Sequence, residues 1–162
     1  MSISKKEVIV YTDGAASGNP GPGGYGVVLL YKGYRKELAE GFRNTTNNRM
    51  ELLAVIKALE AMKEEGLVIH IYSDSKYVVD AVMKGWLWNW QKKGFKGKKN
   101  PDLWMRFIPA YRKHSVHFHW VKGHAGNPEN ERCDELAVAS YKKPNLQPDT
   151  GYEQAAKAGA LY

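Results

Sequence analysis

The chain has 162 residues, of which 43% are hydrophobic and 25% charged, and its formal net charge at pH 7 is +7. These values are typical of one compact globular domain, and no run of about 18 consecutive apolar residues predicts a transmembrane helix. The positive charge favours a polyanionic partner such as nucleic acid, although its distribution matters more than its total.

The single cysteine, Cys133, excludes an intramolecular disulfide and a zinc site built on cysteines. We interpret it as a small buried hydrophobe rather than a catalytic thiol, because no partner base is recognisable beside it. The N-terminal residues lack the apolar stretch and the cleavage site of a signal peptide. We therefore expect a cytoplasmic monomer that does not bind membranes.

Three N-terminal runs rich in β-branched and aromatic residues predict strands that form an antiparallel meander. They are residues 7–12, 25–31 and 34–42. The stretch from 14 to 24 is rich in Gly and Pro, so we expect a loop there.

Apolar residues at helical spacing then predict a long helix that ends at Gly66. These residues are Leu52, Val55, Ile56, Leu59 and Met62. The remaining expected elements are a strand at 67–73, helices at 75–84 and 101–113, a strand at 116–121 and a helix that starts at 127–128.

The resulting order is β-β-β-α-β-α-α-β-α. A meander followed by alternating helices and strands predicts an α/β fold with a mixed sheet flanked by helices. We assign residues 1–144 to a single domain. Residues 145–162 are small and polar with an Ala-rich stretch, so we expect a loosely structured C-terminal tail.

Four acidic residues mark a candidate site. Asp13 closes the first predicted strand, Asp74 closes the fourth, Glu51 lies in the first turn of the long helix, and Asp134 lies in the last helix. If the first and fourth strands are parallel neighbours, Asp13 and Asp74 emerge side by side where ligands bind in open α/β sheets.

Taken singly, each acid has an ordinary structural interpretation as a helix cap, a turn residue or a solvated helix residue. Taken together, clustered carboxylates repel one another and require a cation. Hard oxygen ligands select Mg²⁺ or Mn²⁺, and a pair of such ions forms a clamp for phosphoryl transfer.

Several segments of the chain resemble the bacterial ribonuclease HI family, the type 1 ribonucleases H. The matching segments are residues 11–14, 18–26, 45–52, 73–75, 120–126 and 130–137. Together they cover nearly the whole chain, from about residue 7 to residue 152, in the order of the family. The resemblance implies a ribonuclease H-like fold with a five-stranded mixed sheet.

The resemblance also implies an endonuclease that hydrolyses the RNA strand of an RNA–DNA hybrid with two metal ions, leaving 5′-phosphate and 3′-hydroxyl ends. It makes Asp13, Glu51, Asp74 and Asp134 the metal ligands, with Mg²⁺ expected and Mn²⁺ as a substitute. His124 matches the catalytic histidine of the family. A histidine titrates near neutral pH and can move a proton at the metal site or help the product leave.

A basic and aromatic segment lies between residues 84 and 99, and we call it the basic segment. It resembles the protrusion with which the family grips the DNA strand, and it is several residues shorter here. Its charge suits phosphates and its rings suit sugars or bases, although part of the tryptophan set is expected in the core.

The resemblance extends to other positions that contact the hybrid. The substrate-binding residues it implies are Asn19, Thr46, Asn47, Asn48, Lys76, Trp86, Trp90, Lys92, Lys93 and Asn100. The asparagines at 19, 47 and 48 match contacts in the minor groove, Thr46 and Asn100 match a DNA-phosphate pocket, and Lys76 stands where the family often has Gln. Turn chemistry and helix capping are the alternative roles of the asparagines.

Two other functions remain open at this stage. A non-catalytic module that binds RNA–DNA hybrids would keep the fold but is expected to lack one of the acids. Another nuclease or phosphoryl transferase on the same fold would share the acids but not the basic segment and the asparagines. Fold alone does not decide between them.

Overall fold

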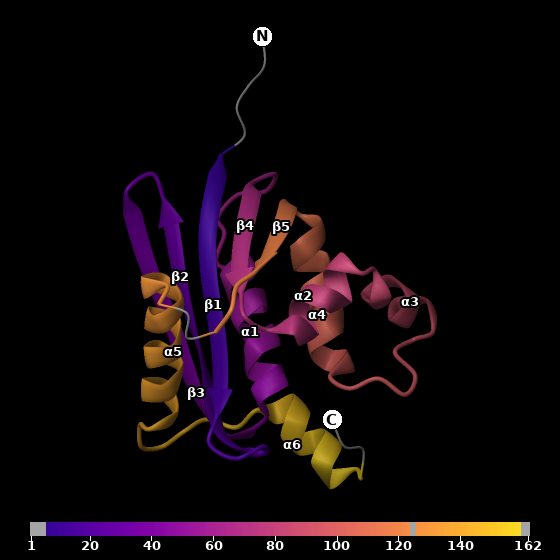
Figure 1. The fold of residues 1–162 in the computed structure, drawn as a ribbon. Coiled ribbons are helices and arrows are strands. Elements are labelled where there is room, and N and C mark those ends of the chain that lie inside the picture. Colours follow the sequence, from indigo (N-terminus) through magenta and orange to yellow (C-terminus); the bar gives the residue numbers. More distant parts are fainter. Residues whose placement is uncertain (1–5, 124–125, 160–162) are drawn as a thin grey trace.

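The computed structural model of the chain describes residues 6–123 and 126–159. Five strands form one sheet in the order β3-β2-β1-β4-β5 (Figure 1). The strands are β1 (Glu7–Ala16), β2 (Gly21–Tyr31), β3 (Tyr34–Thr45), β4 (Val68–Ser73) and β5 (Ser115–Trp120). The helices are α1 (Asn47–Glu60), α2 (Lys76–Met83), α3 (Trp86–Lys92), α4 (Pro101–Arg112), α5 (Pro128–Tyr141) and α6 (Thr150–Lys157).

The sheet is mixed, as the sequence predicted. β1 pairs antiparallel with β2 and β2 with β3, whereas β1 pairs parallel with β4 and β4 with β5. The helix α1 lies on one face, and α5 covers β1, β2 and β3 on the other (Figure 1). The longest helices, α1 and α5, have 14 residues each, and no helix in the described part of the chain has the length and hydropathy to span a bilayer.

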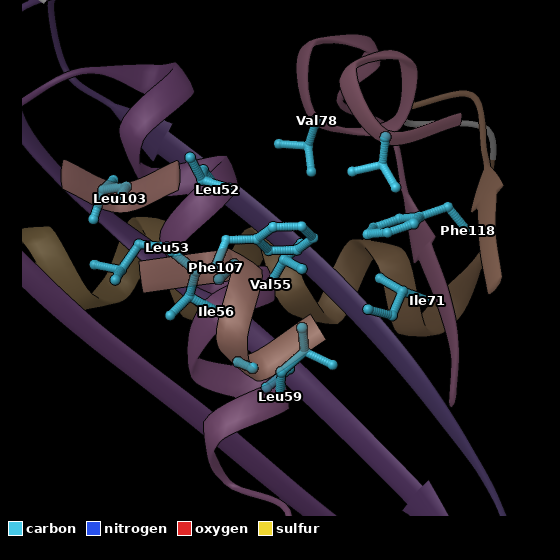
Figure 2. Packing of buried hydrophobic residues seen from close by; sticks show 14 of the residues in the cluster. Leu52, Leu53, Val55, Ile56, Leu59, Ile71, Val78, Leu103, Phe107 and Phe118 are labelled. Atoms are coloured by element: carbon cyan, nitrogen blue, oxygen red, sulfur yellow. The ribbon is translucent and has the colours of Figure 1, made fainter. Parts of the chain in front are cut away.

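The main core lies between the sheet and the α1 and α4 helices. Strand alternation turns Val8 and Val10 of β1 towards α1, where they are buried. Figure 2 shows Phe107 of α4 between the side chains of α1 and Phe118 of β5, whose ring centroid is 6.4 Å away. Burial of this apolar surface fixes α1, and therefore Glu51, against the centre of the sheet.

The expected loop at 14–24 is wrong for most of its length. β1 continues to Ala16, β2 begins at Gly21, and only a tight turn joins them. Gly14 allows close packing rather than a loop, because a Cβ atom at this position would lie 2.3 Å from the backbone nitrogen of Glu51. The absence of a side chain therefore lets β1 and α1 approach each other.

The structure contains two helices that the sequence did not predict. α3 lies in the basic segment, and its three tryptophans at every second position hide the helical period. α6 lies in the segment expected to be a loose tail. In the described part of that segment, residues 145–159, Asp149 and Tyr152 are buried, so the expectation of a loosely structured tail does not hold there.

A buried arginine holds the C-terminal segment in place. Arg49 of α1 is 1% exposed and donates hydrogen bonds to Asp149, to Asp102 at the start of α4 and to the side-chain oxygen of Asn100. Thr45 also donates to Asp149, at 2.7 Å. Three segments that are distant in sequence therefore meet at the N-terminal end of α1.

Candidate active site

The four predicted carboxylates lie in β1, directly after β4, in α1 and in α5. Thr12 of β1 is paired with Ser73 of β4 in parallel register, so Asp13 and Asp74 follow directly on neighbouring strands. This confirms the adjacency on which the sequence argument depended. Glu51 is the fifth residue of α1, and Asp134 lies in α5.

Three of the four acids form a close cluster. Carboxylate oxygens of Asp13, Glu51 and Asp74 all lie within 4.8 Å of one another. Asp134 lines the same pocket, which has a volume of about 380 Å³, but it stands outside the close cluster. The structure thus brings all four predicted acids to one pocket and joins three of them tightly.

Burial and mutual repulsion disfavour the charged form of this cluster. Burial, followed by the charge of Asp74, raises the pKa of Asp13 to about 7, although the backbone N–H of Gly14 donates to it at 2.9 Å. Burial and the charges of Asp13 and Asp74 raise the pKa of Glu51 well above its ordinary value. A cation in the pocket would remove this penalty.

The donor set fits a hard divalent cation. One oxygen of Glu51, Oε1, and one of Asp74, Oδ1, are buried and have no hydrogen-bond partner among the described residues. Buried oxygens without partners are costly, and a metal ion is the partner that a group of carboxylates accepts. Oxygen ligands of this kind favour Mg²⁺ or Mn²⁺ over softer ions.

A polar group beside the acids comes from the β1–β2 turn and the start of α1. Asn19 accepts a hydrogen bond from the backbone of Asn47 at 3.1 Å, and the Asn47 side chain accepts one from the backbone of Ala16 at 2.7 Å. Asn48 and Asn47 line the pocket, and Thr46 caps α1 by accepting from the backbone of Arg49. The turn role considered for the asparagines is therefore present at Asn19 and Asn47, whereas the cap of α1 is Thr46 and not an asparagine.

Lys76 and Trp120 form a pair that the sequence did not predict. The ammonium of Lys76 lies 4.9 Å from the centre of the Trp120 ring, and the Trp120 indole N–H donates to the backbone oxygen of Asp74 at 3.2 Å. Lys76 lines the pocket, and 47% of the Trp120 surface is exposed. The pair follows from the β4–β5 register, which places Trp120 opposite Ser73, the residue before Asp74.

The basic segment forms an extension of the molecule around α3 (Figure 1). Its tryptophans divide as expected: Trp86 is exposed, with Lys84 above its ring, and Trp88 packs on the core. Trp90 packs edge-on against Trp104 and carries Lys98 above its ring. The six lysines are all exposed, at positions 84, 92, 93, 96, 98 and 99.

Asn100 is placed differently from an exposed phosphate ligand. It is 2% exposed, its side-chain nitrogen donates to the Tyr77 hydroxyl at 2.9 Å, and its oxygen accepts from Arg49 at 3.3 Å. The side chain is therefore occupied by protein partners. Its backbone lies in the left-handed region, with a φ of 61°.

His124 lies outside the described residues. Its chain neighbour Gly123 is described, and a Cβ atom there would lie 2.7 Å from a carboxylate oxygen of Asp74. The chain therefore passes close to the Asp74 carboxylate at Gly123.

Comparisons with known proteins agree on one family. The RNase H family model matches residues 5–142. The ribonuclease H of Desulforamulus reducens is 60% identical over 154 residues, which are 92% of this chain and 96% of that protein.

Two solved structures extend the comparison. The crystal structure of LC9-RNase H1, a type 1 RNase H with the type 2 active-site motif, has a TM-score of 0.78 at 34% identity and covers 100% of this chain and 88% of its own. LC11-RNase H1 in complex with an RNA/DNA hybrid has a TM-score of 0.63 at 27% identity, and the match covers 83% of this chain and 96% of that chain.

Proposed function

Because this chain belongs to the ribonuclease H family of nucleases, in its bacterial type 1 group, we propose that it hydrolyses the RNA strand of RNA–DNA hybrids with divalent ions held by its four acids. The observation that carries the proposal is the close cluster of Asp13, Glu51 and Asp74, with two buried oxygens that have no hydrogen-bond partner in the described part of the chain. The related LC11-RNase H1, solved with an RNA/DNA hybrid, supports the choice of substrate.

Mg²⁺ is the ion we propose, with Mn²⁺ as a substitute, and Asp13, Glu51, Asp74 and Asp134 are its ligands. When bound, two such ions supply Lewis acidity that activates the attacking water and stabilises charge on the leaving oxygen. The carboxylates fix the position of this charge. Because Asp13 and Glu51 are buried, the attraction between these carboxylates and a bound ion would be stronger than in water.

The reaction we propose is hydrolysis at phosphorus. A water molecule forms a new P–O bond, the bond from phosphorus to the RNA 3′ oxygen breaks, and a proton passes to that oxygen. The products carry 5′-phosphate and 3′-hydroxyl ends. We assign the proton movement to the imidazole of His124, because the neighbouring Gly123 lies against Asp74 and histidine titrates near neutral pH.

We assign hybrid recognition to two groups of residues, the asparagines beside the acids and the basic segment. Asn19, Asn47 and Asn48 offer both donors and acceptors, which suits 2′-hydroxyls and base edges in a minor groove. The basic segment offers Trp86, Trp90 and its lysines, including Lys92 and Lys93, to the DNA strand. Burial of the Asn100 side chain leaves Thr46 as the more accessible member of the proposed phosphate pocket.

A non-catalytic hybrid-binding module would be expected to lack a metal-binding acid. All four acids line one pocket here, which favours the enzyme.

We also propose that the protein acts as a monomer in the cytoplasm.

Cleavage of RNA–DNA, RNA–RNA and DNA–DNA duplexes of one sequence, each with Mg²⁺ or Mn²⁺, tests the proposal. We expect cleavage of the RNA strand of the hybrid alone, no cleavage without metal, and no cleavage by the Asp13→Asn variant, which still binds hybrid. The Glu135→Gln variant, which changes an exposed acid on the same helix as Asp134, serves as the control and should keep full activity. Full activity of Asp13→Asn would exclude the metal-ligand role.

A further inference from the structure

Three of the five histidines gather on one exposed part of the sheet. His70 lies in β4, and His117 and His119 lie in β5, where His70 is paired with His117 and Tyr72 with His119. Strand alternation turns Ile69, Ile71 and Phe118 into the core, so these histidines point to the opposite face. The helix α5 covers that face over β1, β2 and β3, and no helix among the described residues lies in front of β4 and β5 there (Figure 1).

The rings of these residues lie close to one another at small interplanar angles. The Tyr72 and His119 rings stack at a centroid distance of 4.7 Å, and His70 stacks between His119 and His117 at 5.2 Å from each. The His70 side chain is 24% exposed.

Two nitrogens of the stack face each other. His70 Nδ1 lies 3.0 Å from His119 Nε2, while His70 Nε2 lies 3.4 Å from a carboxylate oxygen of Glu7. The carboxylate favours a proton on His70 Nε2, which leaves the lone pair on Nδ1. Histidines that bind metals commonly have this arrangement, in which a carboxylate fixes the tautomer through the second ring nitrogen.

We propose that His70 and His119 bind a late first-row transition ion such as Ni²⁺, Cu²⁺ or Zn²⁺, at a site separate from the four acids. Imidazole nitrogens favour these ions over Mg²⁺. Nitrogen ligands lie about 2.0–2.1 Å from such an ion, so two of them 3.0 Å apart would meet it at an angle of roughly 95°.

The surroundings allow the pair to bind an ion. Water can complete the coordination, because the site lies at the surface and His117 beside it is exposed. Burial and the charges of His70 and His117 lower the pKa of His119, which keeps its nitrogens free of extra protons at neutral pH. The ordinary alternative is a hydrogen bond between the two imidazoles with no ion, and the experiment below separates the two.

The test uses the full chain with Asp13→Asn and His124→Ala as background, which removes one proposed ligand among the acids and the histidine proposed to act beside them. Excess Mg²⁺ is present throughout, and Ni²⁺ binding is measured by titration calorimetry. We expect one ion per chain and at least a tenfold loss of affinity in His70→Gln and in His119→Gln. The His114→Gln variant, at the start of the same strand pair, should bind Ni²⁺ like the background protein.

Two further measurements keep the test independent of folding defects. Ni²⁺ should raise the Tm of the background protein and leave that of His70→Gln and His119→Gln unchanged, since an ion that binds only the native state stabilises it. With Cu²⁺, electron paramagnetic resonance should show coupling to two imidazole nitrogens. Absence of saturable Ni²⁺ binding, or binding by both variants as tight as by the background protein, would overturn the site and leave a hydrogen-bonded pair.

Discussion

The guanidinium of Arg49 donates to both carboxylate oxygens of Asp149, at 2.7 and 2.9 Å, across 100 positions of the sequence. The pair is almost fully buried, with side-chain exposures of 1% and 9%. It joins the segment that carries α6 to the start of α1, two residues before Glu51. The C-terminal segment is therefore connected directly to the helix that supplies part of the active site.

Asp149→Asn should lower the free energy of unfolding by about 3 kcal/mol, because it leaves a buried guanidinium with one charged partner fewer. Urea denaturation followed by circular dichroism measures this value. The control is Glu153→Gln, which removes the exposed ion pair between α6 and Arg43 and should change stability little. Equal losses in the two variants would contradict the importance of the buried pair.

The stability of the metal-free protein should fall as the pH rises from about 4 to about 7. The pKa of Asp13 is raised from 3.8 to about 7 in the folded state, so folding favours the protonated acid, and this contribution is lost as Asp13 ionises. Unfolding measured across this range in the presence of a chelator tests the sign. Asp13→Asn should be more stable than the parent at pH 7 and should have a flatter profile.

Protons should compete with metal at the same carboxylates. The apparent affinity for Mg²⁺ should therefore decrease as the pH falls below about 7, where Asp13 becomes protonated. Calorimetric titration with Mg²⁺ at several pH values checks this. An affinity independent of pH between 5 and 8 would be incompatible with Asp13 as a ligand.

Replacing the lysines at 92, 93, 96, 98 and 99 with alanine should raise KM for the hybrid by about tenfold or more and reduce its dependence on salt, because fewer counterions are released on binding. The reference variant replaces five exposed lysines elsewhere, at positions 32, 36, 63, 142 and 143, and so has the same net charge. We expect a smaller effect there. The same salt slope in both variants would show that total charge, not the basic segment, determines binding.

His124→Ala should lower the turnover number by on the order of 10²-fold, in keeping with the loss of a general acid–base group. Mg²⁺ affinity should stay unchanged, since the four acids are intact. Single-turnover kinetics separate the chemical step from product release, and His114→Ala controls for the loss of a histidine elsewhere. A turnover number equal to that of the parent would reduce His124 to an ordinary connecting residue.

The sequence predicted the parts of the fold that depend on local pattern. The strands that carry Asp13 and precede Asp74 could be located from their β-branched runs, and their parallel pairing followed from topology. The expected strand end at Asp13 is wrong, because β1 continues to Ala16. The burial of Asn100 could not be foreseen, because its partners Arg49 and Tyr77 are far away in sequence. α6 was missed for the same reason, since its anchor is Arg49.

Glycines were the main source of error in the N-terminal half. Gly14 and its neighbours were interpreted as loop residues, whereas Gly14 lies inside a strand against α1. A count of glycines does not distinguish flexibility from close packing, because both use the same missing side chain. Contact with an element 37 positions away decides which applies.

The absent side chain at Gly14 also determines the width of the metal site. A methyl group there would overlap the backbone of Glu51, so α1 would have to move outward and carry its carboxylate away from Asp13 and Asp74. The spacing between the ligands is thus set by a residue with no functional group. Gly14→Ala would impair the enzyme as an active-site substitution does, although it removes no ligand, charge or proton donor.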